Sequence, residues 1–155
     1  MSIQDIQEND MREITYKVYT FDEHPNKQVV FEWVRNNWHD LGQHNVEEMI
    51  DSLKAASDEF GGRLDYAISA VPDRGEFVKI EGFDQRLLDQ AKEEECPLTG
   101  HCYDITVIRA MRDGNLSESV LGELHAETEY AYSDEGLAET LSINDYEFTI
   151  SGECA

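Results

Sequence analysis

Short stretches of the chain alternate apolar and polar residues, while longer stretches repeat apolar residues at helical spacing. The alternation over residues 14–18 predicts a first strand. Helical spacing over residues 29–38 and again over residues 45–60 predicts two helices. Asn45 can cap the second helix, and Gly61-Gly62 can end it.

A β-hairpin is predicted in the middle of the chain. Apolar residues alternate over residues 64–70 and again over residues 77–80. Between them, Val71-Pro72-Asp73-Arg74-Gly75 has proline and glycine where a turn needs them. A helix is predicted to follow over residues 84–95 and to end at Cys96-Pro97.

The last third of the chain is predicted to contain two strands and two helices. Alternation over residues 103–107 and over residues 144–150 predicts the strands. Helical spacing predicts a helix over residues 117–132. Ser133 can cap a short helix whose first turn is acidic.

These elements together predict an α+β fold. We expect a single domain with an antiparallel sheet of about five strands and with helices packed on one face. The length of 155 residues and the 40% of hydrophobic residues suffice for one core. We expect a flexible N-terminus over residues 1–11 and one acidic domain over residues 12–155.

The charge of the chain is strongly negative. Its 34 acidic residues stand against 12 lysines and arginines, which gives a net charge of −22. No lysine or arginine follows Arg112, although this final segment contains 11 acidic residues. Such a surface repels a nucleic-acid backbone and attracts a basic protein from a distance. Salt adaptation is disfavoured, because glutamate outnumbers aspartate and five lysines are kept.

Two rows of acidic side chains are candidates for binding a basic partner. Acids at every second to fourth residue of a helix form a coarse version of the charged row of a nucleic acid. Charge runs are usually solvated faces, but such faces mix both signs, and the C-terminal row contains no base. The candidate residues are Glu123, Glu127, Glu129, Asp134, Glu135 and Glu139 in one row, and Asp89, Glu93, Glu94 and Glu95 in the other.

Metal binding and catalysis receive little support from the residue patterns. Cys96, His101 and Cys102 lie close together, and Cys154 or His125 could join them, but the Cys-x5-Cys spacing is weak for zinc. We therefore predict no metal site and no cofactor. No nucleophile motif or phosphate-binding loop is present, and we predict that the chain is not an enzyme.

The location of the protein is predicted from its cysteines and its apolar segments. An odd number of cysteines, three, favours reduced thiols over a secreted disulfide framework. The first residues contain neither a basic region nor an apolar run, so we expect no signal peptide. We expect a cytoplasmic protein that does not bind membranes or nucleic acids directly.

Two terminal segments resemble a family of small acidic proteins encoded by bacteriophages and prophages. The C-terminal likeness is carried by residues 129–140, EYAYSDEGLAET, and residues 144–149, NDYEFT. The N-terminal likeness is carried by residues 16–23, YKVYTFDE, although His24-Pro25 stands where the family usually continues with Leu-Ser. The resemblance implies a phage accessory protein in a bacterial host cell and brings no catalytic residues.

Charge and resemblance together lead to a functional hypothesis. We expect an inhibitor that binds the basic nucleic-acid-binding groove of a host defence complex, as an anti-CRISPR or anti-restriction protein. The partner would be a basic host protein or ribonucleoprotein. The alternatives are an antitoxin-like binder of one basic protein, or a small metal-dependent enzyme that uses the histidines and carboxylates.

Overall fold

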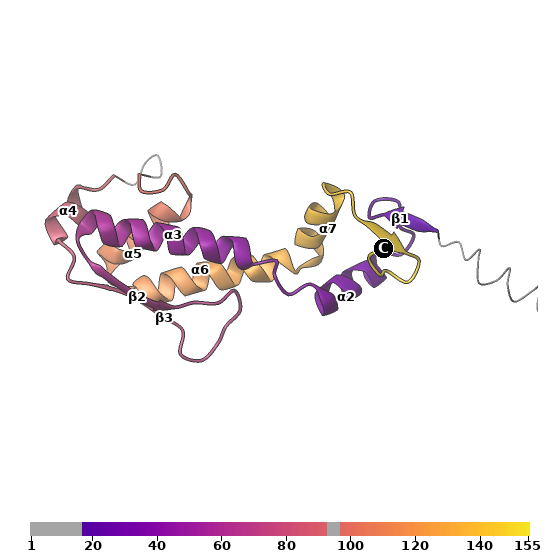
Figure 1. The fold of residues 1–155 in the computed structure, drawn as a ribbon, viewed down its shortest axis with the longest axis horizontal. Helices are drawn as coiled ribbons and strands as arrows, with labels where there is room; N and C mark the ends of the chain where they lie inside the picture. Colours follow the sequence, from indigo (N-terminus) through magenta and orange to yellow (C-terminus); the bar gives the residue numbers. More distant parts are fainter. Residues whose placement is uncertain (1–16, 93–96) are drawn as a thin grey trace, which may run out of the picture. The chain divides into compact units, whose positions relative to one another are not determined.

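The computed structural model describes residues 17–92 and 97–155 (Figure 1). The chain divides into two compact units. The terminal unit combines the chain up to Trp38 with Asp134–Ala155, and the central unit is His39–Ser133. Two compact units can belong to one domain, so the single domain over residues 12–155 stays a prediction. Residues 1–11, predicted to be flexible, lie outside the described part.

The terminal unit brings the two ends of the described chain together in one small sheet. Strand β1 (Val18–Thr20) pairs antiparallel with β4 (Glu147–Thr149), and Tyr19 lies opposite Phe148. A strand is therefore present near each end, but β1 shares only Val18 with the prediction over residues 14–18, of which residues 14–16 lie outside the described part, and β4 is shorter than the strand predicted over residues 144–150. In the second, only Phe148 is buried, whereas Tyr146 and Ile150 are exposed.

Two helices pack with this sheet in the terminal unit. They are α2 (Lys27–Asn37) and α7 (Asp134–Ser142), which confirms the helix predicted over residues 29–38 and the short helix after Ser133. Apolar side chains three or four residues apart on each helix share the core with β4. The fully buried side chains are Val30, Val34, Leu137, Leu141 and Phe148.

The central unit packs three helices around one hydrophobic core. They are α3 (Gln43–Phe60), α5 (Tyr103–Asp113) and α6 (Leu116–Ala131). Helix α3 is the helix predicted over residues 45–60, and Gly61 ends it with a φ of 76°, a left-handed conformation that glycine adopts without strain. Asn45 is not its cap, because the helix already begins after Gly42, which packs against the side chain of Thr128.

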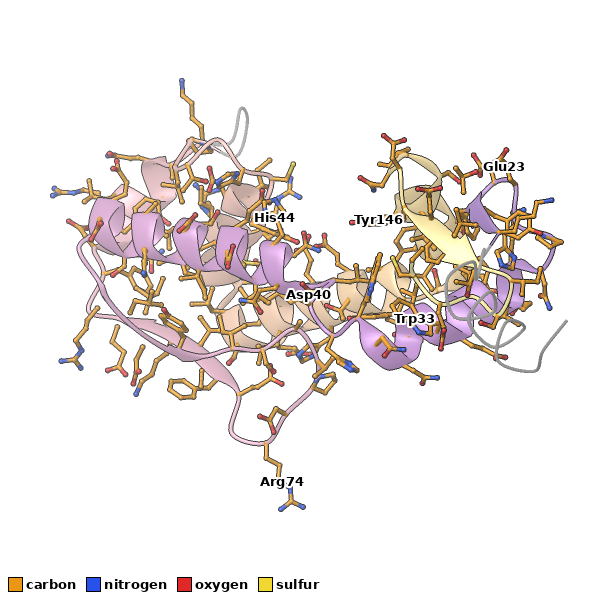
Figure 2. All side chains as sticks on the ribbon, turned by 45° about the vertical axis from the view of Figure 1, so that its right-hand side comes forward. Glu23, Trp33, Asp40, His44, Arg74 and Tyr146 are labelled. Carbon is orange, nitrogen blue, oxygen red and sulfur yellow. The ribbon has the colours of Figure 1, made fainter. Side chains whose placement is uncertain are left out.

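The predicted hairpin is confirmed in the central unit. Strand β2 (Arg63–Ala67) pairs antiparallel with β3 (Phe77–Glu81), and Leu64 lies opposite Ile80. Val78 and Ile80 point into the core, while Lys79 and Glu81 are exposed. Figure 2 shows Arg74 projecting from the tip of the connecting loop.

Residues 103–107 form the start of α5, so the strand predicted there is wrong. Tyr103 and Val107 are four residues apart and share one buried helical face with Ile108 and Met111. Ile105, which the alternation placed beside them, is only partly buried. The α+β class is confirmed, but the sheet of five strands is not. The described residues form two separate sheets of two strands each.

The helix predicted over residues 84–95 is shorter in the structure. Helix α4 (Gln85–Gln90) is capped by Asp84, whose carboxylate accepts a hydrogen bond of 2.9 Å from the Arg86 N–H. Only Leu88 is buried there, whereas Leu87 is exposed. The guanidinium of Arg112 donates to the carbonyls of Leu88 (2.8 Å) and Ala91, which satisfies the end of α4.

Candidate acidic interface

The predicted acids on α6 do not share one face of the helix. Successive residues of an α-helix are about 100° apart, so Glu123 and Glu127 lie about 40° apart, whereas Glu129 lies about 160° from Glu127. Exposure agrees with this geometry, because Glu123 and Glu127 are partly buried and Glu129 is exposed. The three carboxylates cannot present one continuous row.

Glu127 is held by neighbours inside the central unit. The hydroxyl of Tyr103 on α5 donates a hydrogen bond to its carboxylate. Burial raises the pKa of Glu127, and the negative charge of Glu48 on α3 raises it further. Glu127 is therefore a partly buried group under repulsion, and its carboxylate is less accessible to a partner than that of an exposed glutamate would be.

Glu48, which repels Glu127, also lies beside two histidines. Its Oε1 lies 2.8 Å from His44 Nε2, one helical turn earlier, and 3.8 Å from His101 Nδ1. Figure 2 shows His44 on α3. The sequence associated His101 with cysteines, but the structure places its ring beside a carboxylate.

The loop that carries His101 is fixed by a single buried carboxylate, that of Asp104. Its Oδ2 accepts hydrogen bonds from the backbone N–H groups of Leu98 (3.0 Å), Thr99 (2.7 Å) and Gly100 (3.1 Å). Its Oδ1 accepts from the hydroxyls of Ser52 (2.6 Å) and Thr99 (2.7 Å). Burial raises the pKa of Asp104, but the hydrogen bonds from Ser52 and Thr99 outweigh it and hold that pKa below its usual value.

The described part of the structure adds no support for a metal site to the weak spacing of the cysteines in the sequence. Within residues 17–92 and 97–155, no three His, Cys, Asp or Glu side chains are arranged to hold a metal ion. Cys102 is exposed, and Cys96 lies outside these ranges. His125 Nε2 donates to the buried carboxylate of Glu76 at 3.0 Å, so its ring serves the loop between β2 and β3.

The predicted acids after Ser133 belong to the terminal unit. Asp134 lies 2.5 Å from the guanidinium of Arg35 and 3.4 Å from the amide of Gln28, so it ties α7 to α2. The hydrogen bond from Arg35 lowers the pKa of Asp134, and the one from Gln28 adds to this effect. Glu135 and Glu139 are exposed and one turn apart. Their role in binding a partner stays a prediction.

The second predicted row falls mostly outside the described residues. Asp89 is exposed on α4 and accepts a hydrogen bond of 2.9 Å from the side chain of Gln85. Glu93, Glu94 and Glu95 lie in the part that the structure does not describe.

An exposed acidic stripe on α3 was missed by the sequence analysis. Glu47, Asp51 and Asp58 are all exposed and lie within about 40° around the helix axis, and we call them the α3 stripe. None of them forms an ion pair within the described residues, although Lys54 lies on the same face. The same spacing that identified the apolar face of this helix would have revealed the stripe on the opposite side.

Comparison of the chain with family models, with curated proteins and with solved structures finds no match in any of the three. In the described ranges, every helix is too short or too polar to cross a lipid bilayer.

Proposed function

We propose that the protein binds a basic, nucleic-acid-binding surface of a partner protein and blocks access of nucleic acid to it. The partner would belong to a host defence system, such as a CRISPR or restriction complex. That part of the proposal rests on the resemblance of the terminal segments to phage-encoded proteins. The binding mode rests on the charge and on its arrangement.

The α3 stripe is the observation that carries the binding mode. Its three carboxylates stand on one rigid helix that is anchored in the core by Met49, Leu53 and Phe60. Along the helix axis Glu47 and Asp51 lie about 6 Å apart and Asp51 and Asp58 about 10 Å apart, with Lys54 between the latter two, compared with 3.4 Å per phosphate along one DNA strand. The stripe therefore presents a fixed but coarser row of negative charge. Attraction of this kind acts mainly on the association rate and weakens with salt.

The first experiment identifies the partner and its binding surface. The full-length protein is immobilised, and proteins retained from a bacterial lysate are identified by mass spectrometry. We expect a retained nucleic-acid-binding protein that is released by added duplex DNA or RNA, because both ligands would occupy the same basic surface. A retained protein that nucleic acid does not displace would contradict the proposal and favour an antitoxin-like binder.

Charge reversal then tests whether the arrangement of charge matters. One variant changes the α3 stripe to lysine, and a matched control changes Glu59, Asp65 and Asp113. These control residues are also exposed acids of the central unit, but they are scattered over three elements. Both variants alter the net charge equally. A third variant reverses Glu129, Glu135 and Glu139, the exposed members of the predicted C-terminal row that form no ion pair within the described residues.

We expect the α3 variant to slow association with the captured partner at least tenfold more than the scattered control does. Association rates would be measured at about 0.05 M and at about 0.15 M salt. At the higher concentration the screening length shortens to about 8 Å. Equal loss in the α3 variant and the control would show that only bulk charge matters. The mimicry would then fail even though the attraction is real.

A further inference from the structure

The central unit contains a hollow of about 450 Å³ beside strand β3. Val78 and Ile80 of β3 and Ala110 and Met111 of α5 form its buried apolar wall. The turn between α5 and α6 forms the opposite rim. This volume lies within the range of about 300–1,000 Å³ that is usual for ligand sites in proteins. An apolar group can therefore enter without displacing the core.

The hollow lies along the edge of β3 that no strand covers. The β2–β3 sheet has two strands within the described residues, so β3 has one free edge. The N–H of Val78 donates to the hydroxyl of Ser117 at 2.7 Å, which shows that it points away from β2. Peptide groups two residues apart on a strand point the same way, so the N–H and C=O of Ile80 also face this edge. An extended peptide can bind such an edge through its backbone.

The charge around the hollow favours a cationic occupant. The ammonium group of Lys79 lies 2.9 Å from the carboxylate of Glu81, which offsets its charge. Glu118, at the rim, forms no ion pair within the described residues. The net charge of −22 excludes acidic segments over long distances.

We propose that a short, extended, basic segment of a partner protein binds the free edge of β3. One apolar side chain of this segment fills the hollow, its backbone pairs with Ile80, and a neighbouring lysine or arginine lies beside Glu118. This docking rests on the proposed function, because it supplies the selectivity that long-range charge attraction lacks. A small apolar molecule would leave the peptide group of Ile80 without a partner.

The probe is a pair of capped pentapeptides, Lys-Thr-Leu-Thr-Lys and Lys-Thr-Gly-Thr-Lys, titrated into the full-length protein. Backbone amide shifts in the NMR spectrum report both the site and the affinity. We expect shifts at residues 78–83 and 111–117, and we expect the leucine peptide to bind about 10- to 100-fold more tightly than the glycine peptide. Equal affinities, or shifts centred elsewhere, would overturn the proposal.

Two variants test the two parts of the site separately. Ala110→Leu fills the hollow and should remove the preference for leucine. Glu118→Lys changes only the exposed rim, so it tests the site even if the first variant fails to fold. Glu129→Lys is its matched control, because Glu129 is exposed on the same side of α6 but about 16 Å farther along the helix. At about 0.15 M salt this separation exceeds the screening length of about 8 Å.

We expect Glu118→Lys to weaken the leucine peptide at least fivefold and Glu129→Lys to change its affinity less than twofold. Equal effects of the two would refute the assigned rim. Ala110→Leu is also measured against the partner captured by the immobilised protein. Unchanged partner binding in Ala110→Leu, together with loss in the α3 variant, would refute docking at β3 and leave the proposed function intact. The reverse pattern would refute the charge-mimicry function and retain the docking.

Discussion

Replacing Asp104 with alanine is expected to destabilise the central unit strongly. Five donors point at this one carboxylate, three from the backbone and two from hydroxyls. In the alanine variant the hydroxyls of Ser52 and Thr99, 3.4 Å apart, can turn toward each other. The backbone N–H groups of Leu98, Thr99 and Gly100 have no such substitute.

The size of the effect follows from these lost partners. A buried donor left without an acceptor costs about 1–3 kcal/mol, and Gly100 recovers part of this because it is exposed to water. We therefore expect Asp104→Ala to lower the free energy of unfolding by about 3–5 kcal/mol. Asp104→Asn should cost about 1–2 kcal/mol. Its amide oxygen can still accept from the backbone while the hydroxyls turn to accept from its NH₂ group.

The pH dependence gives this prediction a second measurement. Because the folded state lowers the pKa of Asp104, its contribution to stability is present above the unfolded aspartate pKa of about 3.9. The contribution is lost as the pH falls through the lower folded value. The difference in stability between the wild type and Asp104→Asn should therefore be constant near neutral pH and narrow below about pH 4.

Urea unfolding followed by circular dichroism measures these differences. Asp113→Asn serves as the control, since Asp113 is exposed at the end of α5, and it should change stability by less than about 0.5 kcal/mol. A loss below about 1 kcal/mol in Asp104→Ala, or a difference that persists unchanged at pH 3, would refute the role assigned to this carboxylate.

Three further predictions concern a closely packed glycine, the charge of Glu127 and the cooperativity of unfolding. Gly152 has a φ of 94°, and a Cβ there would lie 2.5 Å from the carbonyl oxygen of Val29, so Gly152→Ala should cost about 2–3 kcal/mol in urea unfolding. Gly75→Ala, with a φ of 79° and nothing within 4 Å, should cost only about 1 kcal/mol, and equal losses would contradict the close approach. Because folding raises the pKa of Glu127, its charged form opposes folding above that pKa. Glu127→Gln should therefore raise the free energy of unfolding by about 0.2–1 kcal/mol at pH 7, and this gain should vanish below about pH 4. A lower free energy of unfolding at pH 7 would contradict the repulsion. Both tryptophans lie in the terminal unit, whereas α3, α5 and α6 of the central unit dominate the circular dichroism signal. If the chain is a single domain, urea unfolding should give the same midpoint by tryptophan fluorescence and by circular dichroism. Two different midpoints would refute the single domain.

The elements that could be predicted from the sequence have local signals that agree with their packing. Helix α3 has a long apolar stripe and a glycine at its end, and the hairpin has alternation together with a specific turn. The segment over residues 103–107 lacked such agreement. Tyr103 and Val107 fit both a strand with alternating residues and a helix with a four-residue repeat. The buried Asp104 favours the helix because its carboxylate holds the preceding loop in place. The spacing of apolar residues along the sequence does not reveal these contacts.

The acidic site could be predicted by sign but not by position. Counting acids along α6 put Glu127 and Glu129 in one row, although residues two apart on a helix point in nearly opposite directions. Contacts with Tyr103 and Arg35 then removed Glu127 and Asp134 from the freely exposed set. Such contacts join residues 24 and 99 positions apart, and no local pattern reports them.

The acidic side chains of this protein fall into two groups with different physical roles. Asp104, Asp134 and Glu76 each accept hydrogen bonds from identified donors, and each carboxylate stabilises the unit to which it belongs. Among the residues that the structure describes, none donates a hydrogen bond to the α3 stripe, and exposed charges of this kind contribute little to folding. Mutual repulsion among them even opposes compaction. Reversing the stripe should therefore preserve the fold, so that a loss of binding in that variant reports the interface and not the stability of the protein.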